Sequence, residues 1–156
     1  MANDPKHFYV TLFSNASQEL FPENTKSSFT IELPQPIDLG PNDTWEVGLC
    51  EFTYPPKFRG TISPNMIIGD TNALIYCNLI RPQFFAHRLI RCLRTVIILS
   101  LPGEPYFQHI YYVPVEKRYI KNIRMEVRDS AGELINFKTD KVPLKFVLHF
   151  RRVPTW

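Results

Sequence analysis

The chain has 156 residues, of which 44% are hydrophobic and 21% charged, and its formal net charge is +3 at pH 7. This composition excludes a disordered or collagen-like chain. A chain of this length buries roughly 70% of the surface that its unfolded form exposes, so we expect a single domain over residues 1–156 with a core that needs no disulfide or metal.

The sequence favours an intracellular setting. No apolar run approaches the ~20 residues that span a bilayer, and residues 1–6 are not followed by the hydrophobic segment of a signal peptide. The three cysteines, Cys50, Cys77 and Cys92, are odd in number and widely spaced. This pattern favours reduced thiols in the cytosol or nucleus.

Strands dominate the predicted secondary structure. Fourteen prolines leave few windows for an uninterrupted helix, and between them apolar residues alternate with polar ones, the period of a half-buried strand. The predicted strands, in chain order, are 7–13, 27–33, 44–53, 73–80, 88–99, 108–114, 120–128 and 144–151. Eight short strands separated by turn residues predict a β-sandwich or barrel. The turn at 129–132 is the clearest hairpin signal.

The segment 81–94 fits two structures. Arg88, Arg91 and Arg94 fall three residues apart with apolar residues between them, as on one or two turns of an amphipathic helix. In a strand, one face would instead carry Arg88, Ile90, Cys92 and Arg94, and the other Leu89, Arg91, Leu93 and Thr95. Periodicity alone does not decide between them.

Motifs that carry chemistry are missing from the sequence. The six glycines form no nucleotide-binding loop, no G-x-S-x-G elbow occurs, and the four histidines lack metal-ligand spacing. We therefore expect no enzymatic activity, catalytic residue, cofactor or metal. Cys50 would be a nucleophile only beside a histidine. In its apolar strand we expect it to be a small buried side chain.

Arginines and aromatic residues point to association. Residues 81–94, with Phe84 and Phe85, combine cations and rings as single-strand nucleic-acid binders do, but four arginines would give only a modest affinity. We therefore do not expect a dedicated nucleic-acid contact. Subunit or interior contacts are the expected role of Arg88, Arg91, Arg94, Arg151 and Arg152. Aromatic residues on both faces of predicted strands make self-association plausible.

Several motifs together resemble a known family. In the first half they are Phe8-Tyr9-Val10-Thr11-Leu12, Ser14-Asn15-Ala16-Ser17, Phe21-Pro22-Glu23-Asn24-Thr25, Phe29-Thr30, Pro36-Ile37-Asp38-Leu39, Trp45-Glu46-Val47-Gly48-Leu49 and Tyr54-Pro55. In the second half they are Ile75-Tyr76-Cys77-Asn78-Leu79-Ile80-Arg81-Pro82-Gln83, Leu93-Arg94, Tyr112-Val113-Pro114, Ile123-Arg124-Met125-Glu126-Val127-Arg128-Asp129, Gly132, Phe137 and Leu148-His149-Phe150-Arg151-Arg152. In this order they resemble the penton, or minor capsid, proteins of Maverick/Polinton elements and adintoviruses.

The resemblance covers about residues 8–152 and implies a structural role. It implies an all-β fold, a single eight-stranded jelly-roll sandwich, and a homopentamer at the fivefold vertex of an icosahedral shell. The implied partners are the double jelly-roll major capsid protein and a vertex fibre or spike. The implied location is the virion, assembled in the host nucleus or cytoplasm. At residues 84–88 it leads us to expect a small glycine-containing turn, where this chain has Phe-Phe-Ala-His-Arg.

Other functions remain open at this point. A jelly-roll carbohydrate- or receptor-binding module would use aromatic residues at loop ends, such as Trp45 or Trp156. A nucleic-acid-binding accessory protein would act through residues 81–94. The capsid hypothesis predicts a fivefold ring, and the carbohydrate-binding hypothesis predicts a monomer that binds a glycan.

Overall fold

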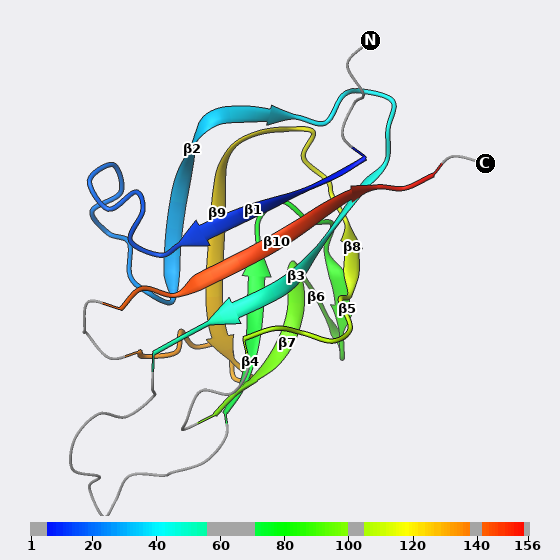
Figure 1. Cartoon of the computed structure of the whole chain (residues 1–156). Coiled ribbons are helices and arrows are strands. Elements are labelled where there is room, and N and C mark those ends of the chain that lie inside the picture. Colours follow the sequence, from blue (N-terminus) through cyan, green and yellow to red (C-terminus); the bar gives the residue numbers. More distant parts are fainter. Residues whose placement is uncertain (1–5, 56–70, 100–104, 138–141, 155–156) are drawn as a thin grey trace, which may run out of the picture.

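The computed structural model describes residues 6–55, 71–99, 105–137 and 142–154, and within them the chain is all β (Figure 1). No helix capable of crossing a membrane occurs in these ranges. The strands are β1 (His7–Phe13), β2 (Ser28–Asp38), β3 (Trp45–Thr53), β4 (Thr71–Cys77), β5 (Gln83–Phe85), β6 (Arg88–Ile90), β7 (Cys92–Ile98), β8 (Tyr112–Pro114), β9 (Tyr119–Asp129) and β10 (Lys145–Arg152).

Two antiparallel sheets of four strands form the body of the molecule. The first sheet has the order β1-β10-β3-β8, and the second has the order β2-β9-β4-β7. Neighbouring strands within each sheet come from distant parts of the chain, and the first and last strands pair along their whole length, from His7 with Arg151 to Phe13 with Lys145. In Figure 1 the strands of the first sheet cross obliquely over those of the second.

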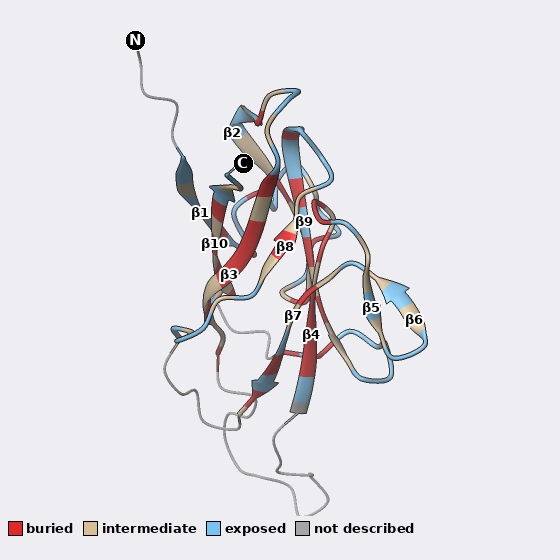
Figure 2. Cartoon of the chain, turned by 90° about the vertical axis from the view of Figure 1, so that its right-hand side faces the viewer, coloured by how far each residue is buried: buried red, intermediate tan, exposed pale blue. Residues whose placement is uncertain are grey.

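The core lies between the two sheets because alternate side chains of each strand point inward. In β10, Phe146, Leu148 and Phe150 are fully buried while the residues between them are partly exposed. Figure 2 shows buried positions along strands of both sheets. Across this core, the Phe146 ring stacks on Phe52 of β3 at 4.7 Å and lies 5.7 Å from Phe29 of β2. These three rings therefore join the two sheets.

Most predicted strands are present, with changed limits. The predictions for 7–13 and 44–53 hold to within a residue, β2 extends five residues beyond 33, and the predicted strand 108–114 shrinks to β8. The turn at 129–132 is present, with Gly132 at a φ of 88° and the Asp129 carboxylate accepting from two backbone amides. An antiparallel bridge joins Arg128 and Leu134 across this turn, so the chain does reverse there as the hairpin signal predicted. The strands 120–128 and 144–151 do not pair with each other, because they lie in different sheets.

Segment 81–94 is not helical. It contains a small two-stranded hairpin, β5-β6, with Phe84 opposite Leu89, and then enters β7. Where β4 pairs with β7, Ile75 lies opposite Arg94 and Tyr76 lies opposite Cys92, so Leu93 has no partner on β4. Leu93 is buried, and the alternation of faces predicted for an uninterrupted strand is broken at this residue. In the described ranges ten strands therefore replace the eight predicted, since this hairpin divides 88–99 and adds β5.

The backbone at the tip of the β5-β6 turn has a conformation that favours glycine. Ala86, at the tip, has a φ of 53°, a left-handed conformation that a Cβ disfavours by about 1–2 kcal/mol. A glycine would adopt it without that cost. Ala86 therefore occupies a backbone conformation that suits glycine.

Replacing Phe146 by alanine should test the packing of the two sheets. Because Phe146 is fully buried and contacts rings of both sheets, the F146A variant should lower the free energy of unfolding by about 3–5 kcal/mol. Urea denaturation would measure the loss. The matched control is Tyr119→Ala, at a side chain that is 63% exposed, and a similar loss in both variants would contradict this description of the core.

Candidate interaction surfaces

Strand register gathers aromatic and imidazole side chains on the outer face of the first sheet. Tyr9 pairs with His149, His149 with Gly48, and Gly48 with Tyr112, so one row crosses all four strands. The adjacent row runs from His7 through Arg151 to Glu46. We call His7, Tyr9, Glu46, Tyr112, His149 and Arg151 the outer-face cluster.

Gly48 permits the central contact of this cluster. The Tyr112 hydroxyl and the His149 Nδ1 atom lie 2.7 Å apart, although the strand β3 separates their own strands. A Cβ on Gly48 would collide with Ile110 Cγ2 and would lie 2.9 Å from the backbone oxygen of Tyr111. Glycine is therefore required here so that the chain from 110 to 112 can lie against β3.

Aromatic and cationic groups pack tightly around His149. The Tyr9 ring stacks on the imidazole with ring centroids 4.4 Å apart. The Arg151 guanidinium lies over the Tyr112 ring at 3.4 Å, a cation–π contact, and forms an ion pair with Glu46. The polar groups of the cluster are thus paired largely with one another.

Two histidines in the cluster share one hydrogen bond. His7 Nδ1 and His149 Nε2 are 3.1 Å apart, and only one of these nitrogens can carry the bridging proton, because two facing N–H groups repel. Burial, the nearby His7 and the Arg151 charge lower the pKa of His149 from its ordinary value, in that order. Burial is also the main cause that raises the pKa of Tyr112. Neutral imidazole and neutral phenol are therefore favoured.

The five predicted contact arginines do not form one patch. Arg91 pairs with Glu116 at 3.2 Å, Arg152 with Asp43 at 3.5 Å, and Arg151 joins the outer-face cluster. Arg88 lies near the 129–132 turn, where its Nη1 atom would be 3.9 Å from a Cβ on Gly132. The arginines selected from the sequence therefore lie in separate parts of the structure, each with its own neighbours.

Arg94 occupies the most unusual setting of the five. Its guanidinium lies 3.7 Å from the centre of the Phe107 ring and 4.8 Å from that of Tyr111, and Nη1 donates to the backbone oxygen of His109 at 2.7 Å. Burial lowers the pKa of Arg94. Within the described ranges it has no carboxylate partner, and its buried Nε makes no hydrogen bond.

Arg94 lies in a groove beside the β5-β6 hairpin. This space of about 300 Å³, which we call the hairpin groove, is lined by Gln83, Phe84, Phe85, Cys92, Leu93, Arg94, Thr95 and Tyr111. Phe84 is 89% exposed, and Figure 2 shows the hairpin projecting from the two sheets. An exposed aromatic ring next to a fixed guanidinium is a composition typical of protein interfaces.

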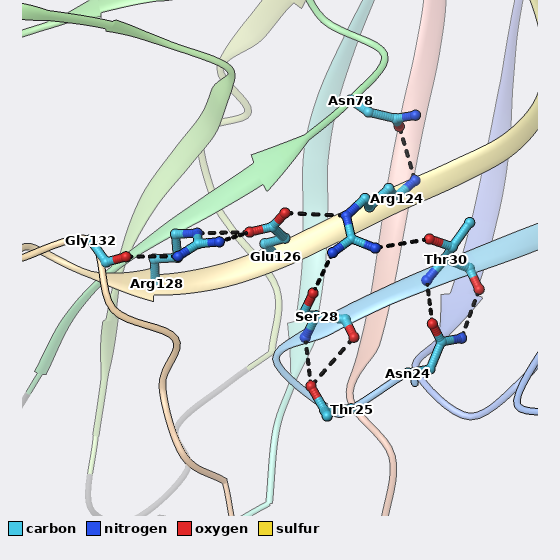
Figure 3. A network of polar contacts seen from close by, with 9 residues as sticks. All are labelled: Asn24, Thr25, Ser28, Thr30, Asn78, Arg124, Glu126, Arg128 and Gly132. Atoms are coloured by element: carbon cyan, nitrogen blue, oxygen red, sulfur yellow. Dashed lines mark hydrogen bonds and ion pairs between the residues drawn. The ribbon is translucent and has the colours of Figure 1, made fainter. Parts of the chain in front are cut away.

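The outer face of the second sheet has a different chemistry (Figure 3). The Glu126 carboxylate accepts from Arg124 at 3.2 Å and from Arg128 at 2.7 Å. Arg124 also donates to the hydroxyls of Ser28 and Thr30 on β2. The outer face of the second sheet is therefore a network of hydrogen-bonded polar side chains, whereas the outer face of the first sheet carries aromatic and imidazole rings.

A second hollow lies at the end of the sandwich that contains Trp45. This space of about 470 Å³ is lined by Phe8, Ile37, Asp38, Leu39, Gly40, Asp43, Trp45 and Arg152. Trp45 itself is only 7% exposed, packs against Phe8 at 5.5 Å, and has a buried indole N–H without a hydrogen-bond partner in the described ranges. Trp156, the other aromatic residue considered for sugar stacking, lies outside those ranges.

Cysteine and metal chemistry have no organised site in the described part of the chain. Burial raises the pKa of the Cys50 thiol, which donates to the backbone oxygen of Val147 at 3.2 Å. Burial also raises the pKa of Cys77 to about 12, so both are thiols at neutral pH. No group of three or more metal-ligating side chains occurs among the described residues.

Comparisons with known proteins give no match: neither a protein-family model nor a curated protein matches the chain.

Replacing Gly48 by alanine should destabilise the first sheet. The added Cβ meets both the Ile110 side chain and the Tyr111 backbone, so the G48A variant should lower the free energy of unfolding by about 1–3 kcal/mol. Chemical denaturation would measure this, with the exposed-turn variant Ser130→Ala as control. An unchanged stability in G48A would show that the 110–112 segment does not pack as described.

The His149 environment predicts a pH dependence of stability. Since the folded protein binds a proton at His149 more weakly than the unfolded chain does, the free energy of unfolding should fall as the pH drops below about 6.5 and level off below the lowered pKa. In His149→Gln this contribution should disappear. Urea denaturation between pH 5 and 7.5 would compare the two, with His87→Gln as control. If wild type and H149Q gave parallel curves, the role assigned to His149 would be wrong.

Proposed function

We propose that this chain is a structural capsid protein, a homopentameric penton that closes the fivefold vertices of an icosahedral shell. The observation that carries the proposal is the strand order. Counted without the β5-β6 hairpin, the two sheets have the orders 1-8-3-6 and 2-7-4-5. A single eight-stranded jelly roll has this order, with its two interlocked Greek keys.

The surfaces support a protein that contacts several neighbours at once. One sheet presents rings and imidazoles, the other a lattice of arginine and glutamate. A third surface, the hairpin groove, combines an exposed phenylalanine with a fixed arginine. A shell subunit needs such chemically distinct surfaces, because it contacts copies of itself on its flanks and different proteins around the vertex.

The remaining partners follow from the resemblance of the sequence to penton proteins. We infer contacts with a double jelly-roll major capsid protein, a location at the capsid vertex of the virion, and attachment of a fibre or spike at the exposed end. Arg88, Arg91, Arg94, Arg151 and Arg152 are proposed to contribute to subunit or interior contacts. Their separate settings suit several contacts better than one continuous patch.

A carbohydrate-binding module is the alternative that shares the jelly-roll fold. Its candidate stacking residue, Trp45, lines a hollow but is only 7% exposed and packs against Phe8, so little of its ring is open to a sugar. A nucleic-acid role would require the arginines of 81–94 to line one path, whereas Arg91 is paired with Glu116 and Arg94 lies among rings. The capsid proposal therefore fits the geometry better.

Mass measurement with imaging tests the proposed function. The purified protein should sediment at five times the 18.3 kDa monomer mass and should give fivefold rings in negative-stain images. Glycan-array binding, measured on the same material, should be absent. A monomer that binds a defined glycan would replace the capsid proposal with the carbohydrate-binding one.

A further inference from the structure

We propose that copies of this chain bind head to tail, with the connection between β1 and β2 of one copy seated in the hairpin groove of the next. The proposal rests on the proposed function, because it names the contact that would close the ring. A cyclic ring uses two different surfaces of each subunit, one for each neighbour. Figure 1 shows the β1–β2 connection on the left flank and the β5-β6 hairpin on the right.

The hairpin groove is cationic and apolar. Its lining residues include one arginine, Arg94, several aromatic rings and no acidic residue. Arg91 already has Glu116 as its partner, whereas Arg94 has no carboxylate partner among the described residues. Its guanidinium is fixed by two rings and a backbone oxygen, and Phe84 stands exposed at the same groove. This site is built to receive an acidic group next to an apolar one.

The β1–β2 connection has the opposite chemistry. This connection, residues 14–27, contains one basic residue, Lys26, and two acidic residues, Glu19 and Glu23. Leu20 lies between the two and is 60% exposed. Neither carboxylate forms an ion pair with a described residue. An exposed leucine flanked by two unpaired carboxylates is the counterpart of the groove.

This connection is held in a fixed shape. Four of its polar side chains are buried, Ser14, Ser17, Asn24 and Ser27. Asn24 exchanges two hydrogen bonds with the backbone of Thr30, and the hydroxyls of Ser14 and Ser17 accept from the backbone amides of Leu144 and Glu32. A loop anchored in this way loses little conformational freedom on binding. It therefore suits a repeated, geometrically defined contact.

The two surfaces are complementary in charge and in apolar character, and because one chain carries both, a second copy can supply the partner of each. Carboxylates of Glu19 and Glu23 would approach Arg94, and Leu20 would contact Phe84 and its neighbouring rings. Charge-assisted hydrogen bonds and a buried aromatic anchor commonly supply most of the binding energy of an interface. A stable contact buries about 800 Å² per partner, so surrounding flank residues complete it.

Two variants, each disabling one surface, test the proposal. Phe84→Asp removes the apolar anchor of the groove and places an acid opposite the acidic loop. Glu19→Lys with Glu23→Lys turns the loop basic. Each variant alone should remain folded by circular dichroism and should associate at least about 30-fold more weakly than wild type in sedimentation. Tyr119→Asp, an exposed aromatic residue outside both surfaces, is the matched control and should behave as wild type.

Mixing the two variants gives the decisive measurement. F84D retains a working loop and the double lysine variant a working groove, so an equimolar mixture should form assemblies that contain the two variants in equal numbers, as measured by native mass spectrometry. Three results would overturn the head-to-tail contact and leave the penton proposal standing. They are pentamers that persist in either variant, a mixture that stays monomeric, and a ring that is lost equally in Tyr119→Asp. Head-to-tail rings of another subunit number would support the contact and overturn the pentamer. A wild-type protein that stays monomeric at all concentrations would overturn both.

Discussion

The register of β10 between β1 and β3 is the constraint on which the rest of the structure depends. Because successive side chains of a strand point to opposite faces, one register sends Phe146, Leu148 and Phe150 into the core and leaves His149 and Arg151 outside. A slip of one residue would exchange the two sets. The stacking of Phe146 on Phe52 and its approach to Phe29 oppose that slip, because they require these rings inside.

The same register creates the surface chemistry. His149 meets Tyr9 on one side and reaches Tyr112 across Gly48 on the other, so the outer-face cluster is a consequence of core packing on the opposite side of the strands. The second sheet repeats the principle with Arg124, Glu126 and Arg128 outside β9. Different outward residues on equivalent strands give one sandwich two unlike faces, which is what a subunit with unlike neighbours needs.

Short-range patterns predicted the limits of some strands well. The limits of β1 and β3 follow from the alternation and from the turn residues after them. Prediction failed where a local signal competed with long-range pairing. The turn at 129–132 suggested a hairpin between its flanking strands, but the bridge across it joins Arg128 to Leu134, and β10 pairs between β1 and β3 in the opposite sheet. Likewise, the three-residue spacing of arginines in 81–94 is compatible with a hairpin followed by a bulge.

The sequence by itself determined that this is a strand-rich protein with an alternating core, and it marked Arg88, Arg91, Arg94, Arg151 and Arg152 as candidate contact residues, because side-chain period and charge are local properties. It had no means of placing Arg94 among Phe107 and Tyr111 or of joining His7, Tyr112 and His149. Those neighbours are separated by up to 142 positions in the chain. Only the tertiary structure decided them, since strand order and register bring distant residues to one place.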